Sequence, residues 1–151
     1  MKEEFVKEEQ SYEAFYETFT NYLTERKYRR TSERYAILEC IYKQEGHFTA
    51  DFLFDALKDK YRVSLPTIYN TLELLVNCRL IVKHQIRNRQ TLYKKNTEKT
   101  VHNYMVCTSC GNVKEFSDKL IKTTVLAKKI SRFQTSNYSL YIYGLCHKCK
   151  K

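Results

Sequence analysis

Two Cys-x-x-Cys pairs stand in the last third of the chain, Cys107 with Cys110 and Cys146 with Cys149. Two intervening residues let a tight turn aim both sulfur atoms at one ion, and two such turns complete a tetrahedron of thiolates about 2.3 Å from a zinc ion. Hydrophilic turn sequence surrounds each pair. The pattern predicts a structural Zn2+ in a four-cysteine site, with two disulfides or a redox-active dithiol as the alternative interpretations.

The length and the ends of the chain bound the class of protein. Its 151 residues suffice for one ordinary domain or two small ones, and a small second domain would benefit from a metal ion. No signal-peptide stretch follows Met1 and no apolar run could span a bilayer, so a cytoplasmic location without membrane association is expected. In a reducing compartment, paired cysteines indicate metal ligands. Cys40 and Cys78 lie within apolar helical patterns and are expected to be small buried hydrophobic residues.

The charge distribution favours an acidic polymer as partner. The formal net charge is +10, although such an excess also serves as a solubilising surface. Seven basic residues and one acid, Glu98, lie between Arg79 and Thr100, and a basic run, 26–30, precedes a slightly acidic stretch, 31–78. Basic groups therefore bracket a helical block, as expected of a block pressed against a phosphate backbone.

Hydrophobic residues recur at helical spacing in four segments. These helices are predicted at residues 9–27, from a cap at Thr31 or Ser32 to Gly46, from a Thr49 cap to near Lys60, and from a Ser64 cap to Leu75. In the third helix, the apolar residues expected to face the core are Phe52, Leu53, Phe54 and Leu57.

The fourth segment has the side chains of a DNA recognition helix. Ile68, Leu72 and Leu75 are expected to face the core, and Pro66 fits the first turn, where its missing N–H does no harm. The exposed N-terminal end then carries polar side chains and one aromatic, which suit base edges and phosphates in a major groove: Ser64, Thr67, Tyr69, Asn70 and Thr71. An ordinary amphipathic helix is the alternative interpretation.

Two strand-like runs, 80–86 and 91–94, follow this helix, and a cationic tip with Arg87 and Arg89 separates them. A hairpin directly behind a candidate recognition helix predicts a winged helix. The two arginines would contact phosphate beside the groove. Residues 1–95 are therefore expected to form a winged-helix DNA-binding domain.

The polar connector 96–100 is predicted to be a hinge that leads into a small zinc-binding domain, 101–151. Strands are expected at 104–107, 112–116 and 138–145, with a helix near 120–132. The last strand is aromatic-rich and edge-prone. Because so small a sheet buries little by itself, a symmetric homodimer is expected. The predicted fold class is α/β, with a winged helix followed by a zinc-stapled dimerisation domain.

A set of short motifs over residues 25–151 resembles the ferric uptake regulator (Fur) family. The motifs are Gly46-His-Phe-Thr-Ala-Asp51, Ser64-Leu-Pro-Thr-Ile-Tyr69, His102 five positions before Cys107, the run from Cys107 to Phe116, and Tyr141-Ile-Tyr-Gly-Leu-Cys146. Each motif is weak alone, and the ordered set is specific. The N-terminal extension has no assigned counterpart.

The resemblance implies a dimeric bacterial transcription factor of iron homeostasis, usually a repressor. Such a protein binds an inverted-repeat DNA operator when a regulatory metal ion is present. The resemblance also implies that the four cysteines hold the structural zinc. By position, Tyr69 matches the tyrosine that contacts thymines, and Arg29 or Arg30 matches a basic residue near the minor groove.

The chain departs from this family in its metal-sensing site. The positions that the family fills with three histidines and two acids correspond here to His47, Lys94, His102, Tyr104 and Glu115. A protonated lysine repels a divalent ion unless burial lowers its pKa, and Lys94 would instead pair with Glu115 and hold the domains closed. An alignment slipped by two residues puts Asn96 at the acid position. His47, His102 and Glu115, with water or Tyr104, remain as a reduced regulatory site for Fe2+, Mn2+ or Zn2+.

Other candidate ligands are weaker. A second non-cysteine site of the family corresponds to Val101, Asn103, Lys122 and Tyr138, none of which is a histidine or a carboxylate, so this site is expected to be absent. His84, on a wing strand, and His147, inside the second Cys-x-x-Cys turn, are expected to be exposed non-ligands. His47 could alternatively cap a helix, and Glu115 could be a surface carboxylate.

An enzyme is not expected. The sequence has no Ser/His/Asp set and no phosphate-binding glycine loop, and four cysteines leave no open position on a zinc ion. The Cys-Pro motif of haem-responsive relatives is also missing. The competing interpretation is a zinc-stapled dimerisation or protein-interaction module whose winged helix does not read DNA.

Overall fold

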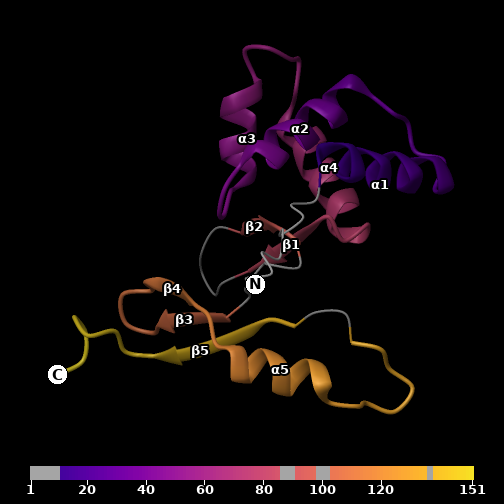
Figure 1. Cartoon of the computed structure of the whole chain (residues 1–151). Coiled ribbons are helices and arrows are strands. Elements are labelled where there is room, and N and C mark those ends of the chain that lie inside the picture. The colour runs from indigo at the N-terminus through magenta and orange to yellow at the C-terminus, as the bar shows by residue number, and fades with distance from the viewer. Residues whose placement is uncertain (1–10, 86–90, 98–102, 136–137) are drawn as a thin grey trace, which may run out of the picture. The chain divides into compact units, whose positions relative to one another are not determined.

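The computed structural model describes residues 11–85, 91–97, 103–135 and 138–151 (Figure 1). The chain divides into two compact units, 1–98 and 99–151. The first unit contains four helices and a β-hairpin, and the second contains a three-stranded sheet and one helix. The expected α/β class, with a helical N-terminal part and a small mixed C-terminal part, is confirmed.

Each helix of the first unit begins after a hydroxyl cap. The helices are α1 (Tyr12–Glu25), α2 (Ser32–Lys43), α3 (Ala50–Leu57) and α4 (Leu65–Asn77). The side-chain oxygens of Ser11, Thr31, Thr49 and Ser64 each accept a hydrogen bond from the backbone N–H three residues later, which satisfies a donor that the first turn leaves free.

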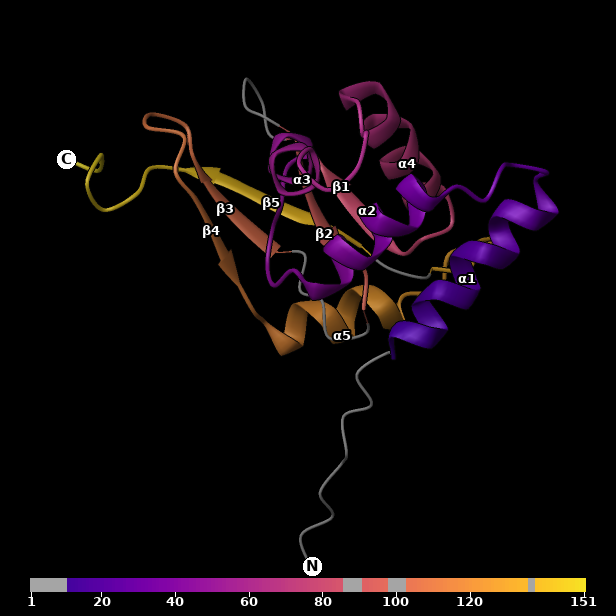
Figure 2. The same cartoon turned by 90° about the horizontal axis from the view of Figure 1, so that it is seen from above.

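The apolar faces of the four helices share one hydrophobic core, with α1 packed along α2 (Figure 2). Fully buried residues of this core include Phe19 and Leu23 of α1, Ile37, Leu38 and Ile41 of α2, Leu53 of α3, and Ile68, Leu72 and Leu75 of α4. The predicted inward orientation of Phe52 is wrong: its side chain is 42% exposed. Ala50, Leu53 and Leu57 form the inner face of α3 instead, at three- and four-residue spacing.

The hairpin joins β1 (Ile81–His84) to β2 (Leu92–Lys95) in an antiparallel ladder that pairs Val82 with Lys94 and His84 with Leu92. A third backbone segment adds to the free edge of β2. The backbone groups of Phe48 and Tyr93 exchange two hydrogen bonds of 2.9 Å, and their rings stack with centroids 5.9 Å apart. The residues just before α3 thus belong to the wing.

The two faces of this wing differ because side chains alternate along a strand. Phe48, Tyr93 and Ile81 point to the helical core and are buried. His47, as the neighbour of Phe48, lies on the opposite face. The strand residues on that outer face are Val82, His84, Leu92 and Lys94.

The sheet of the second unit has the order β4-β3-β5. Its strands are β3 (Asn103–Cys107), β4 (Val113–Phe116) and β5 (Leu140–Gly144), with β5 parallel to β3 and β4 antiparallel to it. Helix α5 (Lys119–Ala127) begins after an Asp118 cap and is shorter than predicted. The parallel pairing brings the end of β5 beside Cys107, so both Cys-x-x-Cys turns leave the sheet at one end.

Much of the apolar surface of the second unit is uncovered. Helix α5 has no buried residue, and Leu120 is 76% exposed. Strand β5 is an edge strand whose Ile142 and Tyr143 are also exposed, as is Leu145 just beyond it. Among the described residues, no helix has the length and apolar character needed to cross a membrane.

Candidate functional site

The two Cys-x-x-Cys turns bring four sulfur atoms together. All ligand atoms of Cys107, Cys110, Cys146 and Cys149 lie within 4.8 Å of one another. The sulfurs of Cys110 and Cys146 are 3.8 Å apart. Thiolates placed tetrahedrally about 2.3 Å from a zinc ion are separated by about 3.8 Å, whereas a disulfide requires about 2.05 Å. All six cysteines are free thiols, so the donor set fits a structural zinc ion and not disulfides.

Backbone hydrogen bonds shape both turns. In the first turn, the N–H of Gly111 donates to the carbonyl of Cys107 over 2.9 Å, and Gly111 has the left-handed φ of +71° that glycine tolerates best. In the second, the N–H groups of Cys149 and Lys150 both donate to the carbonyl of Cys146. The turns are therefore ordered by their own backbone as well as by a metal.

The same backbone favours thiolate at Cys107. Its sulfur accepts the N–H of Cys146 over 3.4 Å and that of Cys110 over 3.5 Å. These two hydrogen bonds, the one from Cys146 first, lower the pKa of Cys107 to about 5. A hydrogen bond from the backbone of Cys149 likewise lowers the pKa of Cys146. The thiolate is the form that binds zinc.

The other two cysteines lie apart from this cluster. Cys40 and Cys78 are half-buried and pack against the core of the first unit. Burial raises the pKa of Cys78 to about 11 and also raises that of Cys40. Both thiols are therefore protonated near neutral pH, and both are half-buried rather than buried as expected.

The N-terminal end of α4 presents a polar surface. Tyr69 is 49% exposed and Asn70 is exposed beside it, while the Ser64 and Thr67 hydroxyls lie 2.9 Å apart. Burial raises the pKa of Tyr93 in β2, and the charges of Tyr69 and Glu73 add to this effect. This end of the helix therefore lies near the wing.

Thr71 does not belong to this surface, and its expected exposure is wrong. Its side chain is 0% exposed, and its hydroxyl donates to the carbonyl of Thr67 over 2.8 Å. Helical periodicity explains the difference, because position 71 lies three residues after Ile68 and one before Leu72, on the buried side. We therefore remove Thr71 from the candidate DNA contacts.

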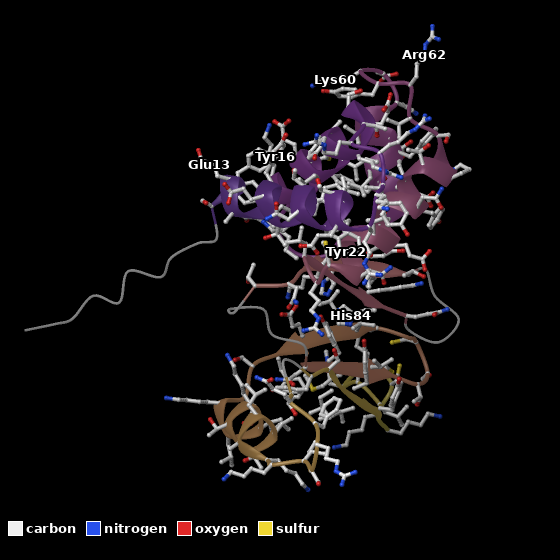
Figure 3. All side chains as sticks on the ribbon, turned by 90° about the vertical axis from the view of Figure 1, so that its right-hand side faces the viewer. Glu13, Tyr16, Tyr22, Lys60, Arg62 and His84 are labelled. Atoms are coloured by element: carbon white, nitrogen blue, oxygen red, sulfur yellow. The ribbon has the colours of Figure 1, made fainter. Side chains whose placement is uncertain are left out.

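Arg29 and Arg30 are exposed in the connection between α1 and α2. The Arg34 guanidinium donates to the carbonyl of Arg29 and lies 5.9 Å from the centroid of the Tyr28 ring. Tyr28 in turn stacks on Tyr22 of α1, which is labelled in Figure 3. This chain of contacts orders the backbone that carries the two arginines. Arg87 and Arg89, the predicted wing-tip contacts, lie outside the described residues.

The wing holds a pair of histidines. The rings of His47 and His84 have centroids 5.9 Å apart and are inclined by 70°. The prediction that His84 is exposed is wrong: it ends β1 and is 1% exposed, and its side chain is labelled in Figure 3. His47 is half-buried. Both residues belong to the first unit.

The remaining candidates for a regulatory site lie in the second unit. Tyr104 is buried and stacks on Tyr141, and Glu115, its cross-strand partner, is exposed. Burial, with the charge of Glu115, raises the pKa of the Tyr104 phenol well above its usual value, which disfavours a phenolate ligand. His102 lies outside the described residues. The pairing of Lys94 with Glu115 stays a prediction.

Comparisons with known proteins decide the family. The model of the ferric uptake regulator family matches residues 25–143. The chain belongs to the ferric uptake regulator family. The resemblance found in the sequence motifs is thereby confirmed, and the match begins at the last residue of α1.

Individual relatives of this Fur-family chain are distant but cover most of its length. It is 32% identical over 120 residues to the ferric uptake regulation protein of Vibrio cholerae, covering 77% of this chain and 79% of the relative. It is 30% identical over 125 residues to the peroxide operon regulator of Bacillus subtilis, covering 82% and 85%. The structure of the Helicobacter pylori ferric uptake regulator shares its fold, with a TM-score of 0.70 at 17% identity over 93% of this chain and 95% of that one.

The structure also describes three residues that were expected at other metal-binding positions of the family. At the second non-cysteine site, Lys122 is exposed, and the buried side-chain oxygen of Asn103 has no hydrogen-bond partner among the residues that the structure describes. A cation and an amide do not fit a metal there. Asn96, the alternative residue for the acid position of the sensing site, donates its side-chain amide to the carbonyl of Arg79 over 3.0 Å.

The structure brings one residue to a candidate site that was not predicted from the sequence, His84. Alternation along the strand could have shown that His84 shares a face with Lys94, two residues along the ladder. The missing information was the pairing of Phe48 with Tyr93, which places His47 on the same face.

Proposed function

We propose that the chain is a dimeric, metal-responsive transcriptional regulator that acts as a repressor and binds an inverted-repeat DNA operator. The observation that carries the proposal is the exposed polar N-terminal end of α4, with Tyr69 and Asn70, in a winged-helix unit of a family of regulators. The role is regulatory rather than enzymatic, and its place is the cytoplasm.

Ser64, Thr67, Tyr69 and Asn70 of α4 would contact the major groove. Arg29 and Arg30 would contact the backbone or the minor groove, and Arg87 and Arg89 the phosphates beside it. The net charge of +10 supports this arrangement because phosphate contacts supply most of the affinity of a DNA-binding protein.

The second unit would supply the dimer contact. Strand β5 lies at the edge of its sheet, and apolar residues of β5 and α5 are uncovered. A symmetric pair of copies would bury them. The structural zinc holds this unit together. Two copies would then place two α4 helices on the two halves of an inverted repeat.

Binding to duplex DNA at several salt concentrations tests the proposal. We expect steeply falling affinity with rising salt and a preference for one operator sequence. Arg30→Gln should flatten the salt dependence by about one phosphate contact. Lys43→Gln, which removes an exposed cation paired with Glu39 at the far end of α2, should leave it unchanged.

A second pair of variants tests the reading helix. Tyr69→Ala should cost about 1–3 kcal/mol on the preferred sequence. Tyr16→Ala removes a tyrosine of similar exposure from α1 and should not change DNA affinity. Weak, sequence-independent DNA binding by the unaltered protein would instead support the protein-interaction module and reject the regulator.

A further inference from the structure

The outer face of the wing brings two imidazoles together from distant parts of the chain. His47 precedes Phe48, whose backbone pairs with Tyr93 of β2, and His84 ends β1 on the other side of β2. Their ring centroids are 5.9 Å apart. Neither histidine belongs to the four-cysteine cluster.

We propose that His47 and His84 together bind a divalent metal ion in the winged-helix unit. An imidazole binds a zinc-like ion through one ring nitrogen at about 2.0–2.1 Å, so two rings that share an ion have centroids about 5–6 Å apart. The observed separation matches that value. His84 is also buried, and water competes less for a metal ion whose imidazole ligand is shielded from solvent.

The ligand types define the class of ion. The described strand residues of this face, taken together with His47, include two imidazoles and a lysine and no carboxylate. Imidazole suits Co2+, Ni2+ and Zn2+, whereas Mn2+ prefers carboxylate and water. The site therefore favours a borderline ion of the Co2+ to Zn2+ group over Mn2+. His84 would replace the acidic ligand of the family, whose expected position on this face is occupied by Lys94.

The position of His47 connects this ion to the DNA-binding helices. His47 is two residues before the Thr49 cap of α3, and α3 packs against α4. An ion shared with His84 would join the segment that leads into α3 to β1, across the whole wing. The metal would thus hold the wing and the helices in one arrangement. This regulatory part of the inference rests on the proposed function; metal binding itself does not.

A metal titration of the full-length chain tests the inference, starting from protein with one zinc ion per chain in the four-cysteine site. We expect one further equivalent of Co2+, seen as visible d–d absorption without a thiolate charge-transfer band. Mn2+ should bind at least about tenfold more weakly. His47→Gln and His84→Gln should each weaken Co2+ binding about tenfold or more, because each removes one of two protein ligands.

His147→Gln is the matched control. It removes an exposed imidazole next to the four-cysteine site while leaving all four sulfurs in place, and it should bind Co2+ as the unaltered protein does. If no second equivalent of Co2+ binds, or if His84→Gln binds Co2+ normally while His47→Gln does not, the inference is overturned.

A measurement on the unaltered protein guards against misfolding of the His84 variant. Imidazole nitrogen resonances of both His47 and His84 should shift when a second equivalent of Zn2+ is added, and an unshifted His84 would reject its role as a ligand. Operator binding is measured separately. If the unaltered protein binds no second equivalent of metal but still binds DNA with sequence specificity, this inference alone is overturned. If it binds no DNA with sequence specificity, the proposed function is overturned.

Discussion

The sulfur atoms of Cys110 and Cys146 lie 3.8 Å apart, although 36 positions separate the two cysteines in the chain. Holding the ends of so long a segment together costs conformational entropy that grows with the logarithm of its length. Within that segment α5 buries none of its residues and offsets little of this cost. A zinc ion shared by the four cysteines would offset this cost.

Replacing one zinc ligand should therefore unfold the second unit selectively. We expect Cys110→Ser to reduce the zinc content from one ion per chain to near zero and to abolish the cooperative melting of this unit, since metal-binding free energy is folding free energy in small zinc domains. Elemental analysis and calorimetry measure the two effects. Cys40→Ala removes a half-buried thiol outside the cluster and should keep the zinc. Full zinc occupancy in the Cys110 variant would contradict the assignment of the four cysteines as its ligands.

Zinc retention should depend on pH in a defined direction. The folded-state pKa of Cys107 is lowered from 9.0 to about 5, so its contribution to stability is complete above pH 9 and is lost as the pH falls through about 5. We expect the protein to keep its zinc at neutral pH and to release it in acid, because protons then compete for the thiolates. A zinc-binding dye followed against pH reports the release. Release already complete at neutral pH would argue against a thiolate favoured by its backbone.

Helix α1 should contribute to the stability of the first unit, even though the family match begins only at its last residue. Phe19 is fully buried in the core, so Phe19→Ala should lower the free energy of unfolding by about 3–5 kcal/mol. Tyr16→Ala, on the exposed side of the same helix, removes a ring that stacks on Tyr35 and is tilted against Tyr12, and it should cost about 0.5–1.5 kcal/mol. Denaturant unfolding of the two variants gives the comparison; equal losses would place α1 outside the core.

Charge on the outer face of the wing should control metal affinity. Lys94→Glu replaces a cation on the face of His47 and His84 with a carboxylate ligand, and we expect Co2+ affinity to rise about tenfold or more and Mn2+ affinity to rise further. Lys83→Glu makes the same change of charge on the opposite face of β1 and is the control. A similar gain in both variants would indicate a general charge effect rather than a ligand.

Local signals in the sequence were sufficient for the helices of the first unit. The caps at Thr31, Thr49 and Ser64 and the apolar spacing of α4 depend on neighbours within a few residues, and the structure contains them as predicted. The four-cysteine cluster was predictable for the same reason, because each Cys-x-x-Cys turn is a local unit and its thiolate ligands indicate zinc.

Side-chain orientation was less predictable where it depends on packing. Phe52 is exposed because Ala50 and Leu53 occupy the inner face of α3. Hydrophobicity alone does not show which of these apolar residues faces the core. Thr71 is buried because its hydroxyl bonds to the backbone of its own helix and so needs no solvent. The role of His84 required the non-local pairing of Phe48 with Tyr93.

The inward orientation of Thr71 has a consequence for how much sequence one copy of the chain can read. With Thr71 turned away, Tyr69 and Asn70 stand on a single exposed turn of α4 that spans only a few base pairs. A recognition sequence of only a few base pairs occurs by chance many times in any bacterial genome. The protein would then distinguish its operator by the fixed spacing between two half-sites. That spacing is a property of the dimer and not of the recognition helix.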